Sequence, residues 1–185
     1  KDATVDNILA ELDWLKGSAS PNDETIIYFA GHADVVKVVD NEAGFFLTHF
    51  ASDQREYRAG GAIPFSHIEL VTDSIAIKGS KVWLITDACR SGTIINETGA
   101  KLSLTALNAN FNSTLKIVSS KPNQLSYEYD EIQHGIFTYY LVQALMGKAD
   151  IAPLDSEMTA DEIRDFIRKN VKTYTDKKQS PSLYA

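Results

Sequence analysis

The pattern of apolar and polar positions predicts short buried strands that alternate with amphipathic helices. Three nearly continuous apolar runs are typical of strands covered on both faces in a parallel sheet, and they lie at residues 25–30, 81–86 and 115–119. Apolar side chains recur every three or four positions in the predicted helices, which lie at residues 5–16, 66–79, 135–146 and 159–174. This order of elements predicts an α/β fold around a mostly parallel sheet.

Local signals mark where the predicted helices begin. Thr4 stands before the first helix as a candidate N-cap residue. Ser66 with Glu69, and Thr159 with Glu162, have the spacing of a capping box, in which the two side chains bond to each other's backbone N–H groups. Ser66 and Thr159 therefore predict the starts of the second and the last helix.

A β-hairpin is predicted within residues 35–48. Asn41 and Gly44 lie between its two apolar runs and favour a turn. Residues 96–114 are polar and asparagine-rich, and they are predicted to form a loop. No linker or internal repeat divides the chain, so residues 1–185 are expected to form a single domain.

Composition narrows the classes of function. The 185 residues are 44% hydrophobic and 23% charged, as in ordinary globular proteins, and no apolar run reaches the 18 or so residues of a membrane span. The net charge of −7 argues against a nucleic-acid partner, because phosphate binding needs clustered basic residues. Cys89 is the single cysteine, which excludes an internal disulfide and is compatible with a reducing compartment, so a cytoplasmic location is favoured.

Candidate chemistry lies where two of the predicted strands end. One run ends in Tyr-Phe-Ala-Gly-His-Ala, which contains His32, and another ends in Asp-Ala-Cys-Arg-Ser-Gly, which contains Cys89. Sites in open α/β sheets form at the carboxyl ends of parallel strands. If these two strands are neighbours, the imidazole can raise the thiolate fraction of the cysteine or move its proton.

Each of these residues also has an ordinary structural interpretation. A lone cysteine is often a small buried hydrophobe, and a lone histidine is often only a satisfied polar group. His32 and Cys89, however, both follow an apolar strand, and a glycine lies close to each of them in the sequence. This coincidence puts a catalytic pair on an equal footing with two unrelated residues, and both interpretations stay open at this point.

The same two motifs resemble those of the caspase, metacaspase and paracaspase clan of cysteine peptidases. The histidine motif is similar to the Gly-His-Gly of that clan, and Asp-Ala-Cys-Arg-Ser-Gly is similar to the Asp-x-Cys-x-Ser-Gly of metacaspases. The caspase histidine precedes the cysteine by about 50 residues, close to the spacing here. Similar segments run from Thr4 to Pro181. The resemblance implies a three-layer α/β/α sandwich with a small hairpin after the histidine, and a first strand–helix unit upstream of Lys1.

The resemblance also implies a role for each matching residue. Cys89 would attack the scissile carbonyl, and His32 would protonate the leaving amine. The backbone N–H groups of Cys89 and Ala33 would form the oxyanion hole. Asp87 would lie at the floor of the S1 pocket, where an anion attracts Arg or Lys and repels Asp; its alternative role is to cap the turn before Cys89. Protein or peptide substrates with a basic P1 residue follow.

Further positions follow from the same resemblance. Ala30, Ser120 and Glu128 are implied as S1 contacts, with Ala30 standing where some metacaspases have Ser. Ala33 replaces the usual glycine, which would strain the backbone if that position needed a positive φ. Self-cleavage is expected after Lys101, in the predicted loop at residues 96–114, or after Arg90, which follows Cys89 directly. Many metacaspases are activated by calcium, but the sequence shows no EF-hand spacing and the histidines are scattered, so no metal ligand and no cofactor are assigned.

Two other functions remain open from the sequence. One is a caspase-like domain without activity that serves as an interaction or regulatory module, since a fold does not guarantee chemistry. The other is a thiol hydrolase or acyltransferase of another kind, which should carry an acid that orients the histidine. Retention of both His32 and Cys89 argues against the first, and the sequence shows no clear acid for the second.

Overall fold

A computed structural model describes residues 2–38, 41–51, 60–88, 115–121, 124–151 and 154–184 of the chain. Within them, one six-stranded sheet has the order β3-β2-β1-β4-β5-β8. The three central strands, β1, β4 and β5, run parallel to one another. Each of the outer strands, β2, β3 and β8, pairs antiparallel with its inner neighbour. The strands are β1 (Glu24–Val38), β2 (Asn41–Leu47), β3 (Ala62–Pro64), β4 (Lys81–Ala88), β5 (Leu115–Val118) and β8 (Ser182–Tyr184).

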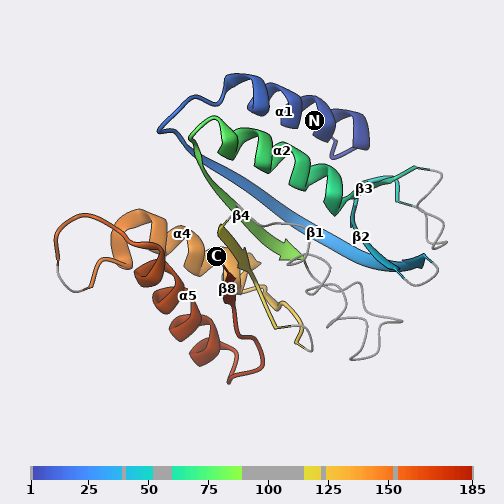
Figure 1. The fold of residues 1–185 in the computed structure, drawn as a ribbon. Coiled ribbons are helices and arrows are strands. Elements are labelled where there is room, and N and C mark those ends of the chain that lie inside the picture. The colour runs from blue at the N-terminus through green and yellow to red at the C-terminus, as the bar shows by residue number, and fades with distance from the viewer. Residues whose placement is uncertain are drawn as a thin grey trace.

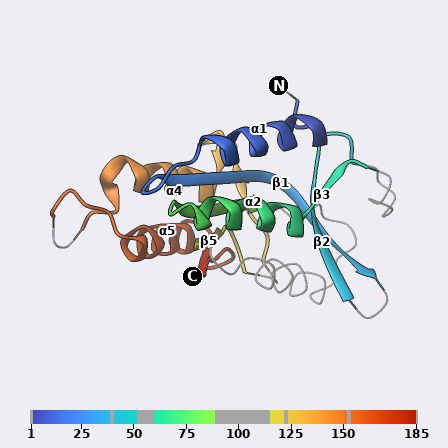
Figure 2. The same cartoon turned by 45° about the horizontal axis from the view of Figure 1, so that its top comes forward.

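Helices cover both faces of this sheet. On one face lie α1 (Val5–Ser18) and α2 (Phe65–Ile77), and on the other lie α4 (Ile136–Gln143) and α5 (Ala160–Tyr174), as Figures 1 and 2 show. The predicted three-layer α/β/α arrangement is therefore confirmed. A π-helical turn (Ala144–Lys148) continues α4, and a short hairpin of β6 (Glu128–Tyr129) and β7 (His134–Gly135) precedes it.

Strand β4 shows why the sheet needs helices on both faces. Successive side chains of a strand point to opposite faces. Val82 and Leu84 pack into the core beneath α1 and α2, whereas Trp83 and Ile85 pack against the core beneath α4 and α5. A strand that is buried on both faces has a nearly continuous run of apolar residues. Such a run is the reason why the sequence predicted a buried strand at residues 81–86.

Strand β1 is longer than the sequence predicts. The apolar run at residues 25–30 continues without a break through Gly31 and His32 to Val38. Gly31 has a φ of 150°, which side-chain-bearing residues rarely adopt. Glycine therefore lets the strand pass from its pairing with β4 into its pairing with β2.

The predicted hairpin exists, but Gly44 does not lie in its turn. Strands β1 and β2 pair as far as Val38 and Asn41, which places Gly44 inside β2. A Cβ atom there would lie 2.3 Å from the ring of Phe65 at the start of α2. Gly44 is therefore a position of close approach between the sheet and a helix, a role that depends on packing and is not visible in the local sequence.

The capping box predicted at Ser66 and Glu69 is wrong. Helix α2 begins at Phe65, and its N-cap residue is Pro64, two positions before Ser66, with no side-chain cap. Pro64 pairs with Phe45 in the sheet, and Phe65 is buried next to Gly44. These tertiary contacts fix the start of the helix and override the local spacing signal.

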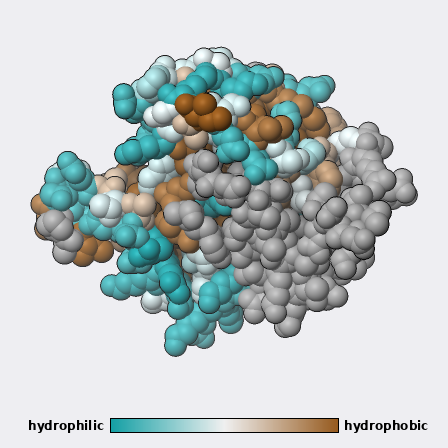
Figure 3. Space-filling view, viewed as in Figure 1, coloured by the Kyte–Doolittle hydropathy of each residue, from teal (hydrophilic) through white to brown (hydrophobic). Residues whose placement is uncertain are grey.

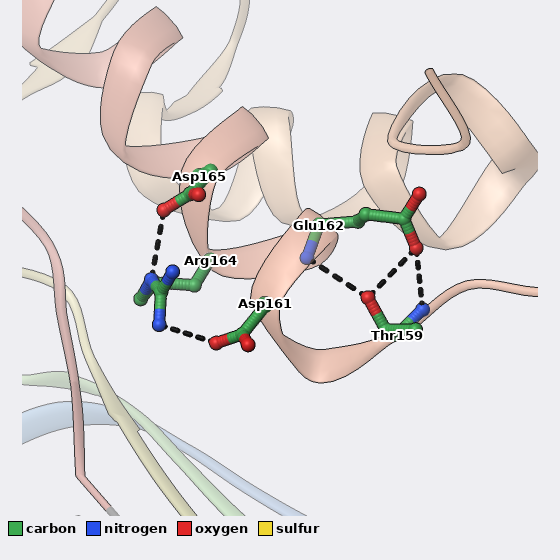
Figure 4. A network of polar contacts seen from close by, with 5 residues as sticks. All are labelled: Thr159, Asp161, Glu162, Arg164 and Asp165. Atoms are coloured by element: carbon green, nitrogen blue, oxygen red, sulfur yellow. Dashed lines mark hydrogen bonds and ion pairs between the residues drawn. The ribbon is translucent and has the colours of Figure 1, made fainter. Parts of the chain in front are cut away.

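The capping box predicted for α5 is confirmed (Figure 4). Thr159 Oγ1 accepts a hydrogen bond from the Glu162 backbone N–H over 3.2 Å, and Glu162 Oε2 accepts from the Thr159 N–H over 2.9 Å. Arg164 forms ion pairs with Asp161 and Asp165 beside it. Because these charges are largely exposed, the ion pairs contribute little compared with the cap.

We therefore expect Thr159→Ala to lower the free energy of unfolding by about 1 kcal/mol, because it leaves backbone donors at the helix start unpaired. Thr159→Ser keeps the hydroxyl and should lose much less. Urea denaturation followed by circular dichroism measures the difference. Equal midpoints for Thr159→Ala and the wild type would show that the box seen in Figure 4 does not stabilise the helix.

Hydrophobic side chains also reach the surface. The space-filling view shows them as separate patches among hydrophilic residues (Figure 3). Ile26 and Tyr28 of β1 are 52% and 42% exposed, although both belong to the central part of the sheet. Tyr28 is relevant to function because its hydroxyl reaches the candidate site.

Candidate active site

Strands β1 and β4 bring the two sequence motifs to the same edge of the sheet. Their parallel register pairs Ala30 with Asp87 and Gly31 with Ala88. His32 is the next residue of β1 and is exposed. It therefore lies at the carboxyl ends of parallel strands, where sites form in α/β folds.

Asp87 is a buried carboxylate, 7% exposed, and both of its oxygens accept hydrogen bonds. Ser126 Oγ donates to Oδ1 over 2.8 Å, and Thr138 Oγ1 donates to Oδ2 over 2.6 Å. Hydrogen bonds from hydroxyl groups to carboxylates are short and about twice as strong as neutral ones. They offset part of the cost of taking this carboxylate out of water.

The amino-terminal end of α4 lies against the same carboxylate. Gly135 is the N-cap residue of α4, and Thr138 belongs to its first turn. A Cβ atom on Gly135 would lie 3.1 Å from Asp87 Oδ2, so the carboxylate approaches the backbone closely there. Because helix amino termini carry a partial positive charge, α4 further favours a negative charge at Asp87.

Within the described ranges, no basic side chain forms an ion pair with Asp87. The buried Lys116 of the neighbouring strand β5 pairs with Leu84, whose side chain packs beneath α1 and α2. Burial lowers the pKa of Lys116, and the charge of Glu69 on α2 opposes this effect. Lys116 therefore lies on the opposite face of the sheet from Asp87 and does not neutralise it.

Two further side chains extend the hydrogen bonds around Asp87. Tyr28 Oη of β1 lies 2.7 Å from Thr138 Oγ1. Gln179 Nε2 donates to Ser126 Oγ over 3.0 Å, and Gln179 itself is completely buried. The carboxylate is thus linked to β1, to α4 and to the segment that precedes β8.

An open hollow of about 640 Å³ adjoins Gly135. Its lining includes two carboxylates, Glu128 and Asp130, together with His134. Glu128 is exposed and stands opposite Gly135 in the β6–β7 hairpin. The described lining of the hollow therefore carries acidic groups, one of which is Glu128. The hollow adjoins the Asp87 site at Gly135.

The other predicted contacts fall near the strand ends. Ala30 is exposed in register with Asp87, and Ser120 is half-buried, with its Oγ donating to the Gln124 carbonyl over 3.2 Å. Ala33 lies opposite Phe46 in the β1–β2 ladder. Its φ is not positive, so alanine causes no backbone strain at this position.

The predicted nucleophile and the two predicted self-cleavage positions, Cys89, Arg90 and Lys101, lie outside the described residues, as does the predicted loop at residues 96–114. Cys89 follows Ala88, the last residue of β4, directly in the sequence. Its function therefore remains a prediction.

Sequence reasoning missed the residues that surround Asp87. Ser126, Thr138 and Gln179 are ordinary polar residues in the sequence, separated from Asp87 by 39 or more positions. One signal could have pointed to Tyr28: it lies two and four positions before Ala30 and His32, and side chains at this spacing in a strand lie on the same face of the sheet. No comparable signal marks the other three.

In the part of the chain that the structure describes, no three histidine, cysteine, aspartate or glutamate side chains gather as metal ligands. None of the helices there is long and apolar enough to span a bilayer.

Comparison with known proteins identifies the family. The caspase-domain model of the peptidase C14 family matches residues 1–185, which is the whole chain. The chain therefore belongs to this family of cysteine peptidases. The resemblance found in the sequence is thereby confirmed at the level of the family.

Several metacaspases are among the relatives that the chain matches. Metacaspase-1B of Aspergillus terreus is 30% identical over 95 residues, which cover 50% of this chain and 24% of the relative. Metacaspase-1 of Debaryomyces hansenii is 29% identical over 99 residues, covering 50% of this chain and 21% of the relative. Metacaspase-1 of Yarrowia lipolytica is 30% identical over 95 residues, covering 50% and 20%. These matches thus span less than a quarter of each relative.

Proposed function

We propose that this protein is a cysteine endopeptidase that cleaves peptide bonds after Arg or Lys. The observation that carries the proposal is Asp87, a buried carboxylate at the end of β4. Hydroxyl groups and a helix amino terminus support its charge, and no basic side chain of the described residues pairs with it. A guanidinium or ammonium group of a substrate would supply the missing positive partner.

The catalytic pair in this proposal is Cys89 and His32. Gly31 and Ala88 are partners in the parallel sheet, and His32 and Cys89 are the next residues of the two segments. A thiol beside an imidazole has the arrangement that activates cysteine nucleophiles. Because His32 and Cys89 each follow a residue of the same β1–β4 pair, the proposal that they act together is supported.

The reaction would proceed in two steps. The Cys89 thiolate forms a bond to the scissile carbonyl carbon, and the C–N bond then breaks as His32 gives a proton to the leaving amine. The Ala33 and Cys89 N–H groups would hold the carbonyl oxygen while it carries negative charge. Water then attacks the thioester, which releases the new carboxyl group and restores the thiol.

Substrate profiling combined with covalent labelling tests this function. The wild-type chain is offered fluorogenic peptides that differ only in Arg, Lys or Asp at P1, and an Arg-based covalent inhibitor is mapped by mass spectrometry. We expect cleavage after Arg and Lys, with the adduct on Cys89. A folded chain that cleaves none of the peptides and takes up no inhibitor would instead be an inactive caspase-like module.

A further inference from the structure

The hydrogen bonds around Asp87 form two chains that end on the same carboxylate. One chain runs from Tyr28 through Thr138 to Oδ2, and the other runs from Gln179 through Ser126 to Oδ1. The four supporting side chains come from separate parts of the sequence. Together they hold a group that the proposed function places at the floor of the S1 pocket.

The direction of the Tyr28 chain follows from counting protons. Thr138 has one hydroxyl proton, and it donates that proton to Asp87 Oδ2. Its contact of 2.7 Å with Tyr28 can therefore be a hydrogen bond only if Tyr28 Oη is the donor. Gln179 Nε2 is a donor to Ser126 in the same sense. Both chains thus point all their donors towards Asp87.

Such an arrangement suits a group that only accepts hydrogen bonds. Each donor in a chain polarises the next one and strengthens its hydrogen bond. With one bond on each oxygen, the carboxylate is also fixed in rotation, and it keeps acceptor capacity on both oxygens. A fixed anion with free acceptor positions is preorganised to receive a cation, because little reorganisation is needed when the substrate binds.

We propose that Thr138 is a positioning residue for substrate recognition, and that Tyr28 acts through it. The inference rests on the proposed function. Thr138 is well suited to this role because its branched side chain has few rotamers in a helix and lies in the first turn of α4, next to Gly135. Tyr28 belongs to the same strand as His32, so the chain of hydrogen bonds couples β1 to the carboxylate on β4.

Kinetics of three variants with an Arg peptide substrate test this role. Thr138→Val keeps the shape and removes the hydroxyl, and we expect it to raise KM by about 10- to 100-fold while kcat changes little. Thr138→Ser keeps the donor and should restore KM to within a few-fold of the wild type. Thr72→Val is the control, because it makes the same change at a buried threonine on α2, where the Thr72 hydroxyl donates to the Glu69 carbonyl and not to Asp87.

Two further measurements separate binding from folding and from chemistry. The inhibition constant of benzamidine, a small aromatic cation, should weaken by the same factor as KM in Thr138→Val. The rate of alkylation by iodoacetamide, which needs the thiol but not the pocket, should stay at the wild-type value. A structural role alone would change the melting temperature and the alkylation rate but would not weaken benzamidine selectively.

The possible outcomes distinguish this inference from the proposed function. A wild-type chain that cleaves no Arg substrate contradicts the function and, with it, the role of Thr138. Wild-type cleavage combined with a Thr138→Val variant that behaves like Thr72→Val overturns the positioning role alone. If Thr138→Val does not fold, Tyr28→Phe decides, because Tyr28 is 42% exposed and its hydroxyl can be removed without opening the core. A KM for Tyr28→Phe equal to that of the wild type would overturn the inference.

Discussion

Cys89→Ala is expected to abolish peptide cleavage while leaving the domain folded. Alanine removes the only thiol of the chain, and with it the proposed nucleophile that would form the acyl-enzyme. His32 is exposed where β1 leaves its pairing with β4, so His32→Ala should be equally harmful to activity without disturbing the core. Initial rates with an Arg peptide, measured together with melting temperatures, check both variants.

The double variant shows whether the two residues act together. Nucleophile and base work as one unit, so the variant that lacks both should be little slower than either single variant. Losses that add up in free energy would indicate that Cys89 and His32 act independently. Near wild-type cleavage by Cys89→Ala would exclude this cysteine as the nucleophile.

The second large effect is expected at Asp87. Asp87→Asn removes the charge that a buried guanidinium needs, and loss of one partner of such a pair costs about 2–5 kcal/mol. We expect kcat/KM for Arg substrates to fall by roughly 30-fold to several thousand-fold. Alkylation of Cys89 should persist, because the nucleophile itself is unchanged.

The hydrogen bonds at Asp87 add a stability effect to this prediction. Both oxygens face hydroxyl donors, so the amide group of an asparagine would point one of its own donors at Ser126 or Thr138. We expect a loss of about 1–3 kcal/mol in the free energy of unfolding from the mismatch. The matched control is Asp165→Asn, which removes one negative charge from the exposed surface of α5.

The alternative role for Asp87 makes a different prediction. If this carboxylate only shapes the turn before Cys89, then Asp87→Asn should slow alkylation along with the loss of stability and leave the ranking of P1 residues unchanged. The alkylation rate and the P1 ranking therefore separate the two roles, because a loss of stability is expected for both. A wild-type profile that favours Asp at P1 would falsify the assignment of Asp87 to the pocket. It would instead indicate specificity like that of caspases proper.

Most of the fold was predictable because its signals are local. The apolar runs of β1, β4 and β5 and the cap at Thr159 depend on side chains within a few positions of one another. The predictions failed where distant parts of the chain meet. The cap predicted at Ser66 yielded to the pairing of Pro64 in the sheet, and Gly44 makes room for Phe65 and does not form a turn.

The small strands were missed for the same reason. Strands β3 and β8 are each three residues long, and β6 and β7 are each two residues long. So short a segment carries no periodicity of its own, and it becomes a strand only because a neighbouring strand offers backbone partners. In β8, the partner is β5, about 65 positions earlier in the chain.

In the candidate site too, local signals were predictable and contacts between distant residues were not. The sequence by itself determined that His32 and Cys89 end apolar segments, and that their motifs are those of a cysteine peptidase clan. It also singled out Asp87. Only the tertiary structure decided what surrounds Asp87, because Ser126 and Thr138 reach it through the packing of α4 and its preceding hairpin onto the sheet. A local motif can specify reactive atoms, but the donors that fix a buried charge are assembled by contacts between distant residues.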